Sequence, residues 1–515
     1  MASPVIDLFA GPGGLGEGFS SVLRGKKRRF KIKLSVEMDA HAHRTLELRA
    51  FVREFPADMI PADYYEYLSG QITRGELFGK YPTQAENAAT EAWCAELGGK
   101  SAPEELLDRR IRVALGDAKQ WVLIGGPPCQ AYSLVGRSRV IGGKGQEIYD
   151  ADPRHHLYKH YLRIIAEHRP PVFVMENVKG LLSAKVKEER IFDRILADLR
   201  NPGVAVKSAP KSDEDEYRLM PLVPTEGELL GGFYAPGDFI IRAEKFGIPQ
   251  ARHRLIILGI RSDIKAQPDL LVPQPDVTVS EAIGDLPRLR SGLSKRNDSG
   301  EAWLRSIELL SERPWFWSDA LSDEVRKGIL AATSRMKADL ERGAAFIPAD
   351  VEPKCHARWY VDPKLGGVCN HETRGHIPGD LHRYLFASVF AKVNGRSPQL
   401  EDFPKPLLPD HKNVKAALKE TKFNDRFRVQ LRDRPSTTVV SHISKDGHYY
   451  IHYDPTQCRS LTVREAARLQ TFPDNYFFEG NRTQQYHQVG NAVPPLLARQ
   501  IAEIVADLLE KDPKL

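Results

Sequence analysis

Cys129 is the residue of this chain best suited to act as a nucleophile. It lies in Gly125-Gly126-Pro127-Pro128-Cys129-Gln130, directly after an apolar stretch that predicts a buried strand. Two glycines and two prolines restrict the backbone there and present the sulfur at the strand end. A lone cysteine is more often a small apolar core residue. Ligands of open α/β sheets bind at the strand ends, however, so this position predicts a reactive thiolate.

A carboxylate and two arginines are placed to assist such a thiolate. Glu176 follows the apolar segment 172–175, where it suits a general acid or, alternatively, a helix cap or a salt bridge. Asn177 is predicted to shape the loop. Arg252 and Arg254 are two residues apart, so in an extended segment both face one side and could hold a base oxygen and a phosphate. The alternative is a pair of surface arginines beside a strand.

A glycine-rich loop follows the first predicted strand. Phe9-Ala10-Gly11-Pro12-Gly13-Gly14-Leu15-Gly16 contains Gly-x-Gly-x-x-Gly between a strand and a helix. Glycines there let a ligand approach the backbone, and the helix N-terminus offers free N–H groups. Glu37 ends the next strand, where a carboxylate can bind ribose hydroxyls. The pattern predicts a nucleoside-type cofactor without specifying it, because dehydrogenases share it and a tight turn with no ligand can look the same.

Alternating strands and helices must position these residues. Apolar runs predict strands at 4–9, 121–124, 172–175 and 255–259, and alternating apolar and polar residues predict another at 30–37. Helices are predicted at 11–23, 159–168, 188–199, 461–471 and 494–509. This alternation predicts a doubly wound, mostly parallel α/β sheet, with the last helix packed on it. Segment 40–110 carries no clear ligand signature, and 201–238 is predicted to be a surface insertion. Periodicity weakens between about 265 and 430, which predicts a second domain.

The composition is that of a globular protein with two or three domains. The chain has 515 residues, of which 41% are hydrophobic and 28% charged. No apolar run reaches membrane-spanning length, and the chain starts directly on a strand, so we expect neither a membrane segment nor a signal peptide. The five scattered cysteines predict reduced thiols in the cytoplasm. A net charge of +6 permits a polyanionic partner but does not demonstrate one.

Together these segments resemble the DNA cytosine-5 methyltransferases. Six blocks occur in the family's order: 7–14 (cofactor loop), 125–130 (nucleophile loop), 176–178 (acid block), 250–254 (arginine block), 461–473 (late helix) and 488–495 (closing block). The similarity covers roughly 4–290 and 432–510. The resemblance implies a Rossmann-like, S-adenosylmethionine-dependent catalytic domain at 1–289, an inserted target recognition domain at 290–432, and closing blocks returning to the catalytic domain at 433–515.

The resemblance also implies roles for individual residues. Cys129 would add to C6 of cytosine and Glu176 would protonate N3. Arg252 and Arg254 would complete the catalytic set, Arg254 toward the base and Arg252 toward the loop or backbone, while Gln250 would support structure. The implied cofactor residues are Phe9, Ala10, Gly11, Pro12, Gly13, Gly14, Glu37, Met38, Asp117, Ala118, Pro128, Leu157, Asn491 and Val493.

Within that cofactor set, Phe9 would stack on adenine, Glu37 would take the ribose hydroxyls, and Asp117 would accept from the adenine amine. Met38 stands where the family often has a larger ring.

A cytosine inside a duplex cannot reach Cys129, so the resemblance implies that the base is flipped out. Residues 130–156 have the glycine content of a mobile lid, although a flexible loop with solvated charges has the same composition. The expected DNA-binding residues are Gln130, Ser133, Arg137, Arg154 and Arg434.

Two further clusters are given less weight. Cys355, Cys369, His371 and His376 lack the paired spacing of a zinc site, so no metal is expected. The basic run 26–29 is interpreted as a solvated face, with DNA contact as the minority interpretation.

The sequence therefore predicts methyl transfer to C5 of cytosine in duplex DNA. We expect a monomeric, cytoplasmic, prokaryotic enzyme, working on nucleoid DNA, that protects host DNA from a separate cognate restriction endonuclease. A tRNA cytosine-5 methyltransferase and a non-catalytic DNA-binding relative remain as alternatives. A nicotinamide dehydrogenase would explain the glycine loop but not Pro-Pro-Cys-Gln.

Overall fold

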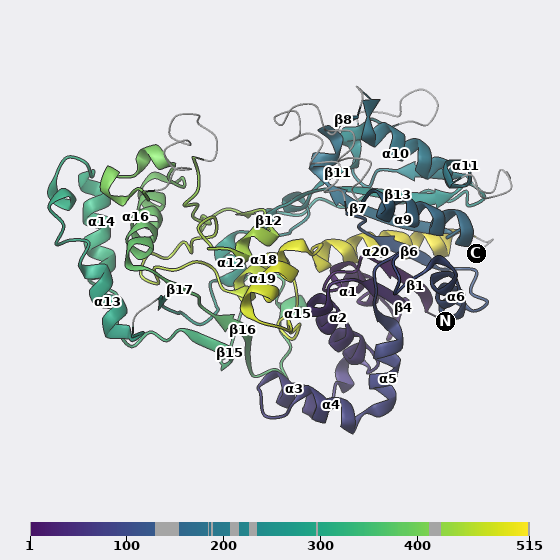
Figure 1. The fold of residues 1–515 in the computed structure, drawn as a ribbon, viewed down its shortest axis with the longest axis horizontal. Coiled ribbons are helices and arrows are strands. Elements are labelled where there is room, and N and C mark those ends of the chain that lie inside the picture. The colour runs from purple at the N-terminus through teal and green to yellow at the C-terminus, as the bar shows by residue number, and fades with distance from the viewer. Residues whose placement is uncertain are drawn as a thin grey trace.

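The computed structural model describes residues 2–128, 154–183, 185–186, 189–206, 216–225, 234–294, 297–410 and 424–512, with backbone alone at 57, 154–156, 183, 185–186 and 189–190. A sheet with its helices lies at one end of the molecule and a helical lobe at the other (Figure 1). Across this described part, no helix is both long enough and apolar enough to cross a membrane.

One mostly parallel sheet organises the larger part of the molecule. Its order is β10-β13-β7-β6-β1-β4-β5, with β11 also paired to β13. The five strands from β7 to β5 run parallel, and β13 runs antiparallel between β7 and β10. The strands are β1 (Ser3–Leu8), β4 (Phe30–Glu37), β5 (Ala92–Cys94), β6 (Val122–Gly125), β7 (Val172–Val178), β10 (Tyr217–Met220), β11 (Ile240–Arg242) and β13 (His253–Arg261). The predicted doubly wound α/β fold is confirmed.

Helices cover both faces of this sheet because successive strand residues point to opposite sides. Val5 packs with Leu497 and Ile501 on one face, whereas Ile6 packs with Leu162 on the other. The first face is covered by α1 (Gly14–Ser20) and α20 (Pro495–Lys511), and the second by α6 (Glu104–Leu115), α9 (Arg154–His168), α10 (Ile191–Arg200) and α11 (Pro202–Val206). Packing of the predicted helix at 494–509 on this sheet is therefore confirmed (Figure 1).

Two segments differ from their sequence-based prediction. β5 lies within 40–110 and forms one edge of the sheet, but its three residues are too few to show a period. β10 lies within the predicted surface insertion, and Tyr217 and Leu219 are buried where it pairs with β13. The rest of 40–91 forms α2 (Ala40–Arg53), η1 (Ala57–Met59), α3 (Ala62–Leu68), α4 (Arg74–Lys80) and α5 (Pro82–Glu91).

The lobe that contains the sheet also has several short elements. They are β2 (Leu23–Arg24), β3 (Lys27–Arg28), η2 (Lys179–Ser183), β8 (Lys185–Val186), β9 (Glu189–Arg190), η4 (Pro236–Phe239), η5 (Ala243–Lys245) and β12 (Gln250–Ala251).

The second lobe has a core of its own around Trp303, Ile329 and Leu385. These residues belong to α13 (Gly300–Glu308), α14 (Asp323–Thr333) and α16 (Pro378–Asn394), which lie farthest from the sheet (Figure 1). Ile451 and Cys458 join the same core, so the packing of this lobe extends past the boundary expected at 432. The other elements of this region are β14 (Gly292–Leu293), η6 (Pro314–Trp317), β15 (Gly343–Pro348), α15 (Ala357–Tyr360), β16 (Gly367–Glu372), β17 (Gly375–His376), η7 (Leu400–Asp402), η8 (Lys405–Leu407), β18 (Ser436–Thr437) and η9 (Ser441–Ser444).

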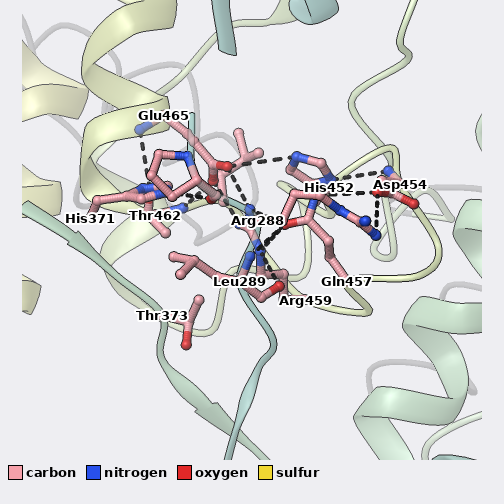
Figure 2. Close-up of polar contacts among 12 residues, drawn as sticks. Arg288, Leu289, His371, Thr373, His452, Asp454, Gln457, Arg459, Thr462 and Glu465 are labelled. Carbon is pink, nitrogen blue, oxygen red and sulfur yellow. Dashed lines mark hydrogen bonds and ion pairs between the residues drawn. The ribbon is translucent and has the colours of Figure 1, made fainter. Parts of the chain in front are cut away.

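Three helices join the two lobes: α12 (Val279–Ile283), α18 (Val463–Leu469) and α19 (Arg482–Asn491). Around the start of α18, charged side chains are buried together (Figure 2). Arg459 and Glu465 form a bidentate ion pair, with N–O distances of 2.7 and 2.6 Å, and each side chain is 1% exposed. Burial raises the pKa of Glu465, but Arg459 outweighs that effect and holds the pKa below its ordinary value.

Two histidines complete this junction (Figure 2). Nε2 of His371 lies 2.9 Å from the Pro287 carbonyl oxygen, so this nitrogen donates and Nδ1 accepts from the Thr462 hydroxyl at 2.8 Å. Nε2 of His452 lies 3.6 Å from Glu465 Oε1. Burial lowers the pKa of both imidazoles to about 4, so both are neutral at pH 7.

Candidate active site

A cavity of about 300 Å³ opens at the carboxyl edge of the parallel strands. Residues that end or follow β1, β4, β5, β6 and β7 line it, because parallel strands finish at one edge of a sheet. The strand order reverses at β1, which lies between β4 and β6. The predicted cofactor residues on the wall are Phe9, Gly11, Pro12, Glu37, Met38, Pro128, Leu157 and Asn491.

The loop after β1 folds sharply to reach this cavity. Phe9 has a φ of 58°, a conformation that is rare for residues with a side chain and that concentrates at functional sites. The Ala10 N–H donates to the Val36 carbonyl at 3.1 Å, which holds the turn against β4. Gly11 has a φ of 57°, and its N–H donates to a Glu37 carboxylate oxygen at 2.7 Å. The turn thus places the Phe9 ring and the backbone of Gly11 on one wall.

The next glycines serve packing within the protein, contrary to the expectation that they face the cofactor. A Cβ on Gly14 would lie 2.3 Å from the Val493 carbonyl oxygen, so glycine is needed where the closing block crosses the start of α1. A Cβ on Gly13 would lie 2.9 Å from Leu46 and from the Tyr476 hydroxyl. Ala10, Gly13, Gly14 and Val493 are not among the residues lining the cavity.

Glu37 offers a fixed carboxylate at the end of β4. Its second oxygen accepts from the Asp39 N–H at 2.7 Å, so two backbone donors orient the group. Burial raises its pKa, and these two hydrogen bonds oppose that shift. Met38, beside it, is 57% exposed and lines the cavity.

Asp117 and Ala118 do not reach this site. They lie between α6 and β6, before the amino end of β6, whereas the cavity opens at the carboxyl ends. The place expected for Asp117 is occupied by Ala95, Glu96 and Leu97, which follow the short strand β5. The sequence did not reveal β5, so the acidic residue after it was missed.

Glu176 and Arg254 form an ion pair at the cavity. Arg254 Nε lies 2.8 Å from Glu176 Oε1, and the side chains are 10% and 14% exposed. The pairing of β7 with β13 brings them together. A Cβ on Gly126 would lie 2.9 Å from Glu176 Oε2, so glycine gives the carboxylate room beside the loop. Glu176 and Gly126 therefore lie side by side on the cavity wall.

Asn177 fixes the segment that leads to Cys129. Its side-chain amide donates to the Pro127 carbonyl at 3.1 Å, and its oxygen accepts from the Val178 N–H at 2.8 Å. Pro127 and Pro128 line the cavity beside Glu176, and the loop-shaping role predicted for Asn177 is confirmed. Cys129, Gln130, Ser133 and Arg137 lie outside the described residues, as does the side chain of Arg154 at the start of α9.

Arg252 holds the main chain, as the resemblance implied, and it is not among the residues that line the cavity, which argues against its place in the catalytic set. The guanidinium is buried, with 1% of the residue exposed, and donates to the carbonyls of Val439, Gly490 and Ala492 at 2.6, 3.2 and 2.8 Å. The Arg252 N–H bonds back to the Gln250 carbonyl at 2.8 Å, so a tight turn interrupts the extended segment and separates the directions of Arg252 and Arg254.

Gln250 is fully buried and its side chain bonds to the main chain of Leu469 and Val439, which confirms its supporting role.

Helix α19 supplies cavity residues that sequence reasoning did not single out. His487 and Asn491 are one turn apart and both line the cavity, with Gln488 between them. His487 stands four residues before the predicted Asn491, and that spacing was the available signal.

Arg434 lines a second cavity, of about 580 Å³, with Lys392 and Arg432. This cavity lies between α16 and residues 429–434 and 453–455 of the second lobe. Among the described residues, no group of three or more His, Cys, Asp or Glu side chains is arranged to hold a metal ion. His371 and His376 instead bond to hydroxyls of Thr462 and Ser460. In the basic run, Arg28 donates to the Phe55 carbonyl and Arg29 pairs with Glu510.

The sheet, the glycine loop and the carboxylate at the end of β4 define a Rossmann-like fold. Residues 104–506 match the family model described as C-5 cytosine-specific DNA methylase, and the chain belongs to this family. It is 34% identical to the type II methyltransferase M.Bpa9945I of Bacillus paralicheniformis over 98% of this chain and 99% of that one.

Two further relatives have the same kind of name. The type II methyltransferase M.AgeI of Thalassovita gelatinovora is 27% identical, over 97% of this chain and 98% of its own. The DNA (cytosine-5-)-methyltransferase M.ApeKI of Aeropyrum pernix is 28% identical, over 76% and 81%. The chain is thus a DNA cytosine-5 methyltransferase of the restriction–modification type.

Proposed function

We propose that this enzyme methylates cytosine in one short duplex sequence, using S-adenosylmethionine and a covalent bond from Cys129 to C6 of a flipped base. The observation that carries the proposal is that Glu176, the partner of Arg254, and the Pro127–Pro128 segment line the same cavity as Phe9 and Glu37. Donor and acceptor sites thus share one opening, as direct transfer requires.

The cofactor fits the groups that line the cavity. Phe9 offers an aromatic face for adenine, and Glu37 offers an oriented carboxylate for the ribose hydroxyls. Glu96 takes the role expected of Asp117, accepting from the adenine amine. Acidic side chains around the cavity suit a ligand with a sulfonium charge. When bound, S-adenosylmethionine supplies an electrophilic methyl group.

The protein's own residues activate the base. The thiolate of Cys129 adds to C6, the electron pair of the C5–C6 bond shifts toward N3, and Glu176 delivers a proton to N3. C5 thereby gains the electron density of an enamine. Arg254 holds the Glu176 carboxyl in place through the 2.8 Å contact, while its Nη1 donates to the His253 carbonyl at 3.0 Å. After transfer, loss of the C5 proton allows the thiolate to leave.

DNA binding is proposed for the face between the two lobes. Arg434, with Lys392 and Arg432 around the second cavity, supplies cations for phosphates. Gln130, Ser133, Arg137 and Arg154 would complete the contacts from the loop after the nucleophile. In this proposal the enzyme acts as a cytoplasmic monomer and protects host DNA from a separate endonuclease.

Bisulfite sequencing of plasmid DNA from a methylation-free host that expresses the enzyme tests this function. Protected cytosines at one short motif, absent with Cys129→Ala, would support it. The Cys129→Ala protein should still bind S-adenosylhomocysteine, since Phe9 and Glu37, which are proposed to bind the cofactor, are unchanged. Unprotected DNA together with methylated host tRNA would overturn the DNA assignment, and protection by the Cys129→Ala enzyme would overturn the covalent route.

A further inference from the structure

The connection between β4 and β5 is much longer than two neighbouring parallel strands require. β4 ends at Glu37 and β5 begins at Ala92, whereas a crossover between such strands needs roughly a dozen residues or more. The excess includes α3, α4 and α5, and we call residues 54–91 the α3–α5 segment. This segment packs with α2 around a core that also contains Leu365 and Cys369, from the chain at β16.

β15 and β16 form a two-stranded antiparallel ribbon that joins the lobes. At the end where β15 begins, Arg342 pairs with Asp298 at 3.0 Å, next to α13 of the second lobe. At the other end, the connection 349–366 lies against α18 of the junction, where the Tyr360 hydroxyl donates to the Arg468 carbonyl at 2.8 Å. A two-stranded ribbon is only marginally stable by itself, so contacts at its two ends must fix its direction.

Polar contacts tie the α3–α5 segment to the second of these ends. The Tyr65 hydroxyl donates to Asp362 Oδ2 at 2.7 Å, and the Asn475 amide donates to the same oxygen at 2.7 Å. Lys364 Nζ donates to the Asp58 carbonyl at 2.7 Å. Burial and the Asp362 carboxylate raise the pKa of Tyr65, so the hydroxyl keeps the proton that it donates.

We propose that the α3–α5 segment is a brace for the second lobe, and that Tyr65 and Lys364 are positioning residues that hold the two lobes at the spacing that duplex DNA requires. This inference rests on the proposed DNA interface between the lobes. α3 and α4 lie at the bottom of the view, and α16, which lines the second cavity, lies at the upper left, so the brace acts on DNA through the ribbon (Figure 1). A protein that holds its binding geometry for only a fraction of the time binds with its affinity reduced by that fraction.

Tyr65→Phe combined with Lys364→Met removes both polar contacts and leaves the apolar core in place. Fluorescence anisotropy measures DNA binding by the full-length protein, with a labelled duplex that carries the motif identified by bisulfite sequencing. The dissociation constant for this duplex should rise about fivefold or more, because a hydrogen bond to a carboxylate is lost at the end of the ribbon. The affinity for S-adenosylhomocysteine in calorimetry should stay within about twofold, since neither residue lines the cofactor cavity.

The matched control is Tyr81→Phe combined with Lys80→Met. Both side chains bond to Asp63 within the α3–α5 segment, the Tyr81 hydroxyl at 2.7 Å, so the same residue types are lost without loss of a contact to the ribbon. This variant should bind DNA as the wild type does.

The salt dependence of DNA binding separates bracing from direct contact with DNA. The slope of log affinity against log salt concentration should be that of the wild type in both double variants. Loss of one phosphate contact would instead lower the magnitude of this slope by about 0.9.

Three results would overturn the brace: equal DNA affinity in the two double variants, a reduced salt slope in the variant of Tyr65 and Lys364, or equal weakening of DNA and S-adenosylhomocysteine binding in that variant. Failure of the wild type to bind the duplex would overturn the proposed DNA interface, and this inference with it.

Discussion

The buried ion pair at the start of α18 should dominate the stability of the junction between the lobes. Glu465→Gln keeps the shape of the side chain and removes its charge, leaving the Arg459 cation with only neutral acceptors. These are the Leu289 and Ser460 carbonyls and the Gln457 amide oxygen, at 2.8 to 3.2 Å. Two unit charges about 4 Å apart attract by about 4 kcal/mol at an effective dielectric constant of about 20. Removing one partner of a buried pair typically costs 3–5 kcal/mol, roughly in line with that value.

Hydrogen exchange of the α18 amides, measured by mass spectrometry on the intact protein, reports the loss of stability at this helix. A fall of about 3–5 kcal/mol in the free energy of opening makes exchange about 10²- to 10³·⁵-fold faster. Arg459→Met combined with Glu465→Gln should recover much of the loss, because no uncompensated charge stays buried.

The matched control is Glu312→Gln. It removes one side of the Arg305–Glu312 pair, whose side chains are 60% and 51% exposed, and should change stability by less than about 1 kcal/mol. Exchange in α18 with Glu465→Gln is compared with exchange near residue 312 with Glu312→Gln. An acceleration by Glu465→Gln that is no larger than the one by Glu312→Gln would refute the reasoning about the buried charge.

Three more outcomes are expected. Gly14→Ala should lower S-adenosylhomocysteine affinity at least about tenfold in calorimetry, because its Cβ would meet the Val493 carbonyl at 2.3 Å; Gly79→Ala, with nothing within 4 Å of its Cβ, should bind normally. Arg252→Met should cost about 2–4 kcal/mol in urea unfolding, because the Val439 and Gly490 carbonyls lose this donor and the Ala492 carbonyl keeps only the Gln470 amide; an unchanged unfolding midpoint with lost methyl transfer would instead return Arg252 to the catalytic set. His371 and His452 have their pKa lowered from 6.5 to about 4 in the folded protein, so the unfolded chain takes up protons first: stability is fully present above pH 6.5 and falls toward pH 4, by about 3 kcal/mol for each histidine. His371→Gln should reduce that acid dependence, measured as the difference in unfolding free energy between pH 7 and 4.5.

Sequence reasoning located residues that follow a long apolar strand. Glu176 stands where an apolar run meets a polar residue, and Glu37 ends an alternating strand; in a parallel α/β fold such strand ends lie at the carboxyl edge of the sheet. Asp117 was wrongly placed for the complementary reason. The strand before the true acidic position, β5, has three residues, and a segment that short carries no period from which to predict a strand.

Side-chain direction was harder to predict than position. The alternation rule for Arg252 and Arg254 assumes an unbroken strand, but the backbone bond from Arg252 to Gln250 makes a turn between β12 and β13. Likewise, Gly13 and Gly14 stand in a motif associated with ligands, yet contacts with Tyr476 and Val493 require them. Those contacts join residues more than 460 positions apart, which no local pattern contains.

That long-range contact has a consequence for how the enzyme comes into being. The glycine loop is made long before α19, Val493 and α20, yet the cavity needs His487, Gln488 and Asn491 for one wall. The Tyr476 hydroxyl also donates to the Pro12 carbonyl, so the early loop is fastened by a late residue. A growing or truncated chain that ends before α19 lacks a wall of the cavity. Enzyme activity therefore requires a chain that has been made at least through α19.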